Sequence, residues 1–225
     1  MRIRPVGANA LLIEVDDPLT WHAELLRRRA AGDLRAVDLV PGARTVLLDG
    51  VPDPAALAEQ LPRWRAADVA APARGGMGGL SGCGGEPGGR TGEPALVPPA
   101  KLLVIDVCFD GPDLPEVADH WGCSPEAVVT RLGGIRFRVA FCGFAPGFGY
   151  LAGLPAELVV PRRAEPRLRV PAGSVGLADR YAGIYPTASP AGWQLVGRTE
   201  VTLFDPARDP PALLAPGTHV QLLAL

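Results

Sequence analysis

Side chains that bind metals or form disulfides are scarce in this chain of 225 residues. It has four cysteines and three histidines. No two cysteines form a CxxC pair, and the histidines lie far apart in the sequence. The sequence therefore indicates neither a zinc site nor a disulfide framework, and we expect no bound metal and reduced cysteines with structural roles.

Long apolar runs and an excess of charge of one sign are also missing. The chain begins MRIRPVGANALLIEVDD, where early acidic residues replace the continuous apolar core of a signal peptide. No run reaches the length of a membrane span. The net charge of −2 provides no basic surface for a phosphate backbone. We expect a cytoplasmic protein that binds neither membranes nor nucleic acid.

Residues 1–70 combine short apolar strands with two amphipathic helices, which predicts a small α+β domain. The first helix places Trp21 and Leu25 on one face, and Arg27, Arg28 and Arg29 are expected to form its solvated side. Strands are predicted over residues 3–6, 10–15, 36–40 and 45–48, and helices over 18–30 and 54–64.

The composition changes abruptly over residues 71–99, where glycine and proline dominate and large apolar side chains are almost absent. Such a segment buries too little surface to offset the entropy of ordering it. We therefore predict a flexible linker or an inserted loop. Its glycines do not form the GxxxxGK[ST] pattern of a phosphate-binding loop.

The segment LPEVADHWGCSPEAVVTRL resembles a DNA-reading helix-turn-helix in the spacing of Ala118, Gly122 and Val128. Its second helix, however, carries a single basic residue, Arg131, in a chain that is net acidic. Binding to DNA phosphates would lack its main electrostatic contribution. We interpret the segment as two short helices that cover the end of a barrel.

The part from residue 100 to 225 is predicted to be mainly β, because short apolar segments alternate there with turns rich in glycine and proline. This spacing is typical of a closed β-barrel or a sandwich. Strands are predicted over residues 101–109, 135–141, 158–160, 174–177, 183–185, 193–196, 201–204 and 219–223.

Three loop-type blocks within this part combine aromatic and cationic side chains. They are FAPGF (144–148), PRRAEPR (161–167) and GIYP (183–186), the last leading to Gly192 and Trp193. Proline and glycine make such loops rigid, and guanidinium groups bind carboxylates or phosphates, so the blocks suggest an anion site. Alternatively, the arginines form structural ion pairs with Glu157, Glu165 and Asp179.

Four ordered motifs resemble the family of 5-oxoprolinase B subunits, also called allophanate hydrolase subunit 1 or the Kip-type kinase inhibitor family. They are FAPGFGYLAGLP, PRRAEPRLRVPAGSVG, GIYPTASPAGWQLVGRT and LFDPARDPPALLAPG. The similarity is dense from about residue 101 onward and loose over the first seventy residues. It implies a cyclophilin-like β-barrel, that is, a carboxyltransferase domain.

The resemblance also implies one component of an ATP-dependent 5-oxoprolinase, which opens 5-oxoproline to L-glutamate together with subunits C and A. Phosphorylating the lactam oxygen activates its carbonyl, and cations must then neutralise the transferring phosphoryl group. ATP with magnesium is expected to be bound by the complex and not by a motif of this chain. The catalytic candidates are Arg162, Arg167 and Arg198; the substrate-binding candidates are Phe144, Pro146, Phe148, Arg163, Ser174, Tyr181, Tyr185 and Trp193.

Two departures from the family pattern bear on the substrate. Relatives typically have Gln-Thr where this chain has Tyr181-Ala182, and a longer glycine-rich loop near Asp110 is shortened. The substrate can therefore differ from 5-oxoproline. Two other functions stay open: a regulatory inhibitor of a sensor histidine kinase, and a subunit of an allophanate hydrolase or urea carboxylase.

Overall fold

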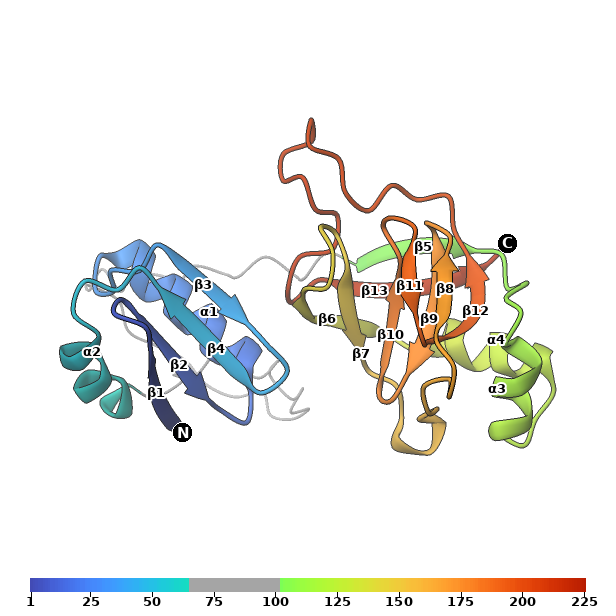
Figure 1. Cartoon of the computed structure of the whole chain (residues 1–225), viewed down its shortest axis with the longest axis horizontal. Helices are drawn as coiled ribbons and strands as arrows, with labels where there is room; N and C mark the ends of the chain where they lie inside the picture. Colours follow the sequence, from blue (N-terminus) through green and yellow to red (C-terminus); the bar gives the residue numbers. More distant parts are fainter. Residues whose placement is uncertain (65–101) are drawn as a thin grey trace, which may run out of the picture.

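The structure is a computed structural model that describes residues 1–64 and 102–225 (Figure 1). The predicted linker, residues 71–99, lies outside these ranges, so its flexibility stays a prediction, as do the domain boundaries drawn from it. No helix in the described ranges is long and apolar enough to cross a membrane.

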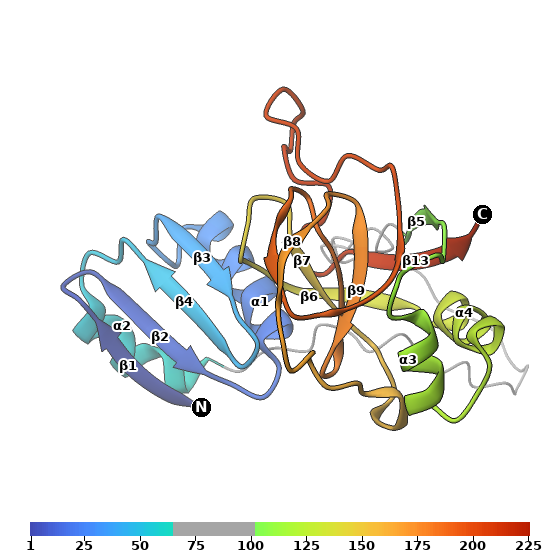
Figure 2. The same ribbon diagram turned by 45° about the vertical axis from the view of Figure 1, so that its right-hand side comes forward.

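The N-terminal unit is a four-stranded antiparallel sheet with two helices on one face (Figures 1 and 2). Its helices begin with matching caps, because Asp17 accepts from the Thr20 amide at 3.1 Å and Asp53 from the Ala56 amide at 3.0 Å. In the order β1-β2-β4-β3, the strands are β1 (Arg2–Val6), β2 (Ala10–Glu14), β4 (Thr45–Asp49) and β3 (Asp38–Pro41); the helices are α1 (Pro18–Ala31) and α2 (Pro54–Gln60), followed by the 3-10 turn η1 (Leu61–Arg63).

The arginines of α1 are more than the solvated face that we expected. The Glu24 side chain is 1% exposed and accepts hydrogen bonds from Arg27 at 2.7 and 2.8 Å and from Arg28 at 2.7 Å. The Arg28 guanidinium also lies 4.3 Å from the centroid of the Trp64 ring. The prediction was wrong for Arg28 because Glu24 lies on the buried side of the helix and draws it inward.

The C-terminal part is a seven-stranded sheet that curls into a nearly closed barrel, as the sequence predicted. Within the described residues, only the pair β5 and β13 is parallel. The two edge strands approach each other where Cys108 and Arg198 exchange backbone hydrogen bonds of 2.9 Å. In sheet order, the strands are β12 (Gln194–Arg198), β9 (Ser174–Ala178), β10 (Tyr181–Ile184), β7 (Gly149–Ala152), β6 (Phe137–Cys142), β13 (His219–Ala224) and β5 (Leu102–Val107).

The helix-turn-helix-like segment forms α3 (Leu114–His120) and α4 (Pro125–Gly134), which lie side by side against the barrel (Figure 2). Ser124 caps α4 through the Ala127 amide at 3.3 Å. Val117 and Val128 are buried in the barrel core. Since the apolar faces of both helices are used in this packing, the interpretation as covering helices is confirmed.

Two predicted strands are absent from the described barrel. Leu158 is instead the last residue of the 3-10 turn η2 (Ala156–Leu158), and Val160 forms an isolated bridge to Asp179. Residues 201–204 are extended with a single bridge from Phe204 to Ala212. Three short strands were not predicted, because glycine or proline within or beside them hides the alternating pattern. They are β7 and the pair β8 (Arg167–Val170) and β11 (Ser189–Ala191).

Candidate functional site

The loop between β6 and β7 presents two aromatic side chains from a tightly held backbone. Phe144 has φ 70°, a left-handed conformation that is costly for a large side chain, and its side chain is 60% exposed. Phe148 is buried, and its amide donates to the Ala145 carbonyl at 3.0 Å. Gly147 has φ 86°, and a Cβ there would lie 2.7 Å from Phe204 Cβ. The loop therefore holds an exposed ring in a strained position.

Phe148 is the centre of an aromatic cluster drawn from four segments. Its ring centroid lies 5.1 Å from Tyr150, 5.4 Å from Tyr185 and 5.6 Å from Trp193, always edge to face. Gly183 makes this packing possible, because a Cβ there would lie 2.7 Å from Phe148 Cζ and 2.9 Å from Trp193 Cζ3. Edge-to-face packing of this kind adds directional attraction to apolar burial, so the cluster holds its shape.

These rings form most of the wall of a pocket of about 200 Å³, which we call the aromatic pocket. Burial, with a smaller contribution from Tyr150, raises the pKa of Tyr185 to about 12, although Arg162 opposes the shift. The phenol is therefore protonated at neutral pH and can donate a hydrogen bond. The pocket is lined by Phe144, Phe148, Tyr150, Arg162, Tyr185, Pro190, Ala191, Gly192 and Trp193.

Among the described residues, Arg162 is the one charged residue in the lining of the aromatic pocket. Its side chain is 61% exposed, and its Nε lies 3.6 Å from Oδ2 of Asp179, whose side chain is 63% exposed. That separation is longer than a hydrogen bond. The guanidinium is therefore available to an anionic group of a ligand.

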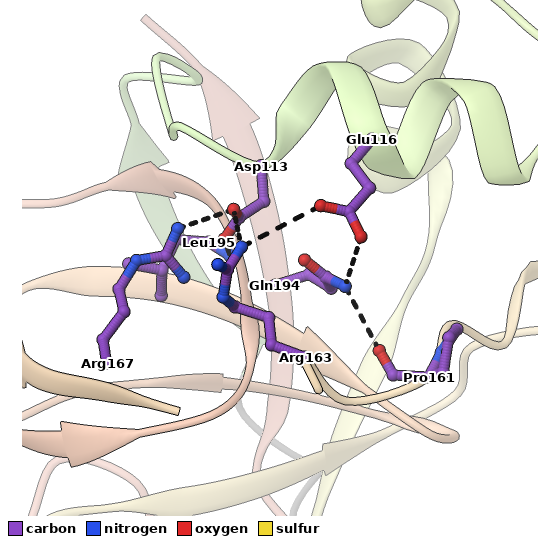
Figure 3. A network of polar contacts seen from close by, with 7 residues as sticks. All are labelled: Asp113, Glu116, Pro161, Arg163, Arg167, Gln194 and Leu195. Atoms are coloured by element: carbon purple, nitrogen blue, oxygen red, sulfur yellow. Dashed lines mark hydrogen bonds and ion pairs between the residues drawn. The ribbon is translucent and has the colours of Figure 1, made fainter. Parts of the chain in front are cut away.

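The other arginines of the same run are engaged with a buried carboxylate (Figure 3). Oδ1 of Asp113 accepts from Arg163 at 2.8 Å and from Arg167 at 2.6 Å, and its Oδ2 accepts from the Leu195 amide at 2.6 Å. Asp113 is only 3% exposed. The alternative of structural ion pairs therefore holds for these two arginines, although their partner is not one of the acidic residues suggested by the sequence.

Two further side chains extend this network toward β12 (Figure 3). Gln194 donates to Oε1 of Glu116 at 3.2 Å and to the Pro161 carbonyl at 3.4 Å. Since Pro161 precedes Arg162 and Trp193 precedes Gln194, the network fixes the backbone on two sides of the aromatic pocket. We call Asp113, Glu116, Arg163, Arg167 and Gln194 the Asp113 network.

Arg198 lies at the closure of the barrel and outside the pocket lining. Its Nε donates to Asp110 at 2.9 Å, and Nη1 lies 3.6 Å from Glu200. The hydrogen bond from Arg198 lowers the pKa of the Asp110 carboxyl. Arg198 therefore already has anionic partners in the described chain.

Three other predicted site residues also lie outside the lining. Ser174 is buried in β9, opposite Arg198. Pro146 is exposed at the tip of the β6–β7 loop. Tyr181 packs edge-on against Tyr150, 5.8 Å away, and so supports the wall from behind. The structure thus brings Arg162, Phe144, Phe148, Tyr185 and Trp193 together, and it leaves Arg163 and Arg167 in the Asp113 network.

Tyr150 and Asp113 are two residues of the site that were not predicted from the sequence, because local patterns hardly indicate them. Tyr150 belongs to the unpredicted strand β7. Asp113 stands where a helix-capping residue is expected, before Leu114 and Pro115, yet its side chain does not cap α3. The carboxylate turns instead toward Arg163 and Arg167, 50 and 54 residues later in the chain. Among the described residues, no three His, Cys, Asp or Glu side chains lie close enough to hold a metal ion.

The nearly closed barrel with its additional α+β unit is the architecture of carboxyltransferase domains. The family model for the carboxyltransferase domain, subdomains C and D, matches residues 1–214, and the chain belongs to this family. The resemblance to 5-oxoprolinase B subunits is also confirmed by curated relatives. The B subunit of the 5-oxoprolinase of Escherichia coli O157:H7 is 38% identical over an alignment of 229 residues, which covers 97% of this chain and 93% of that protein. The protein of the same name from Bacillus subtilis is 41% identical over 128 residues, 56% of this chain and 53% of the relative.

Solved structures agree with the fold. The structure of TTHA0988 matches with a TM-score of 0.71 and 29% identity over 100% of this chain, but the chain spans only 40% of that protein. The urea carboxylase of Kluyveromyces lactis matches with a TM-score of 0.62 at 18% identity, covering 99% of this chain and 21% of that one, which supports the fold alone. The expected cyclophilin-like barrel is confirmed.

Proposed function

We propose that this chain is the B subunit of a cytoplasmic, ATP-dependent 5-oxoprolinase complex, which opens 5-oxoproline to L-glutamate with subunits C and A. The proposal is supported by the curated relatives of that name. It is also supported by the aromatic pocket, whose apolar walls and single cation suit a small cyclic acid.

Arg162 in the wall of the aromatic pocket is the observation that carries the proposal. In our proposal, its guanidinium binds the carboxylate of the lactam, and the rings of Phe148 and Trp193 exclude water around the lactam ring. The Tyr185 phenol, which stays protonated because its pKa is about 12, donates to the lactam carbonyl oxygen. The pocket thereby holds the ring in one orientation, which is a large part of catalysis in phosphoryl transfer.

ATP does not fit the residues of this pocket. A triphosphate needs several cations and backbone donors, whereas the lining supplies only Arg162, and the volume is about 200 Å³. Arg163 and Arg167 are already paired with Asp113, and Arg163 also lies 3.9 Å from Glu116. We therefore propose that ATP and magnesium bind to another component of the complex.

The test is release of glutamate from 5-oxoproline and ATP by the purified chain, by each pair of subunits and by the full set. We expect turnover only with the full set. Arg162→Lys should lower this turnover, because lysine keeps the charge but loses the two-pronged geometry. Arg180→Lys is the matched control, since Arg180 is exposed in the hairpin next to Asp179 and does not line the pocket.

Two outcomes would contradict the proposal. Turnover by the chain alone would show that no shared site is needed. No turnover in any combination would refute the 5-oxoprolinase activity and would favour the regulatory function as a kinase inhibitor.

A further inference from the structure

Arg162 pairs with an exposed carboxylate, whereas Arg163 and Arg167 pair with a buried one. Asp113 is buried and makes close hydrogen bonds, whereas Asp179 is 63% exposed and lies 3.6 Å from Nε of Arg162. An exposed ion pair of this length contributes little to stability. Arg162 can therefore leave Asp179 and pair with another anion at a small cost in free energy.

Asp179 is held by its backbone, whereas Arg162 can move. Asp179 and Arg180 connect β9 to β10, and Asp179 has φ 51°. Its amide donates to the Val160 carbonyl at 2.7 Å, and the two residues form an antiparallel bridge. Because the Asp179 side chain is short and its backbone is fixed, its carboxylate cannot move along with Arg162 when Arg162 rotates away. Arg162 has a long, exposed side chain that can rotate toward the pocket.

We propose that Asp179 determines ligand specificity by neutralising Arg162 until a ligand carboxylate displaces it. The inference rests on the proposed function, because it assigns the ligand class of the same pocket: small ring-bearing monocarboxylates. A neutral ring gains nothing from Arg162 while Asp179 balances its charge. A carboxylate exchanges a loose ion pair for a two-pronged one and buries its ring among Phe148 and Trp193.

The fixed position of Asp179 also sets an upper limit to ligand charge. Once Arg162 has turned to the ligand, the Asp179 carboxylate remains near the pocket without its partner. A second negative charge on the ligand would be repelled by it. The pocket should therefore prefer one carboxylate to none and to two.

The test measures binding of cyclopentanecarboxylate and of its neutral analogue cyclopentanecarboxamide to the purified chain. The fluorescence of Trp193 reports binding, and Trp193→Phe identifies its signal among the four tryptophans. Asp179→Asn removes the charge and keeps a residue that tolerates positive φ. It should tighten carboxylate binding roughly two- to fivefold, the range given by an exposed ion pair, and leave carboxamide binding unchanged.

Two comparisons make the result specific. In an Arg162→Gln background, Asp179→Asn should have a smaller effect, because the competition for Arg162 is gone and only direct repulsion between Asp179 and the ligand carboxylate is relieved. Glu14→Gln is the matched control: Glu14 pairs with Arg4 at 3.7 Å, is 45% exposed and does not line the pocket. It should leave the binding of both ligands unchanged.

The inference is overturned if Asp179→Asn leaves carboxylate binding unchanged or weakens it, if its effect is equally large with Arg162→Gln, or if the wild-type chain binds no cyclopentanecarboxylate. These outcomes are distinct from failure of the proposed function. If the full set of subunits shows no turnover of 5-oxoproline while cyclopentanecarboxylate still binds with the expected effect of Asp179→Asn, the role of Asp179 is upheld and the proposed substrate is rejected.

Discussion

Replacing Asp113 by asparagine removes the only carboxylate that bonds both Arg163 and Arg167 in the described structure. The carboxylate accepts three hydrogen bonds of 2.6 to 2.8 Å, two from guanidinium groups and one from the Leu195 amide. Asparagine has one acceptor oxygen, and its NH₂ group would face a donor. The variant therefore loses hydrogen bonds and leaves two positive charges without their buried counter-charge.

The expected cost follows from the burial of the three partners. Breaking a buried ion pair by removing one partner costs about 3–5 kcal/mol. Asp113 is 3% exposed, but Arg163 and Arg167 are 29% and 24% exposed, so water recovers part of their solvation. We expect the lower end, about 3 kcal/mol, which corresponds to a lowering of Tm by about 6–12 °C for a chain of this size.

Thermal unfolding followed by circular dichroism, with urea unfolding alongside it, measures this loss. Glu116→Gln is the matched control within the same network, because Glu116 is 62% exposed and lies 3.9 Å from Arg163. It should change the free energy of unfolding by less than about 0.5 kcal/mol. A loss below about 1 kcal/mol for Asp113→Asn, or equal losses for the two variants, would refute the reasoning.

Three further predictions test the aromatic pocket and the N-terminal unit. Gly183→Ala should destabilise by about 1–3 kcal/mol in urea unfolding, because its Cβ would overlap Phe148 and Trp193; Gly192→Ala, with 3.6 Å of room, is the control. Because the folded pKa of Tyr185 is about 12, above its ordinary value of 10, stability should fall as pH rises from 10 to 12, and Tyr185→Phe should remove this loss. The pKa of Glu24 is lowered, chiefly by the hydrogen bond from Arg27, so stability is lost as pH falls through that lowered value. Glu24→Gln should cost about 1.5–3 kcal/mol at neutral pH and less in acid; an equal cost at both pH values would contradict it.

Much of the fold could be predicted from local patterns. The strands of the N-terminal unit, β5, β9 and β13 are mostly apolar segments bounded by turns, so their existence and type were right. Strand β7 starts at Gly149 and β11 contains Pro190, and both are short. Their pairing depends on neighbours that are distant in the sequence, which local patterns do not encode.

The candidate site also has features that the sequence predicted and features that it did not. The aromatic blocks were found because glycine, proline and large rings are conspicuous in sequence, and Gly183 shows why they occur together. Asp179, one of the three acidic partners suggested by the sequence, does lie beside Arg162. The partner of Arg163 and Arg167 was not found, because an ion pair carries no sequence pattern. Arg163 bonds a carboxylate 50 residues earlier, whereas Glu157 and Glu165, which are near in sequence, have no ion pair in the described structure.

The arginine segment therefore supplies two different physical functions from adjacent residues. Arg163 is drawn into the buried Asp113 network, which fixes the backbone beside the pocket, while Arg162 keeps a loose partner and faces the ligand. Shape and recognition then depend on different residues, and variants should separate them. Asp113→Asn should lower stability strongly and affect ligand binding through the loosened wall, whereas Arg162→Gln should abolish carboxylate preference at nearly unchanged stability. If Arg162→Gln destabilised the chain as much as Asp113→Asn does, the division would be wrong, and the whole arginine run would have to be regarded as one structural cluster.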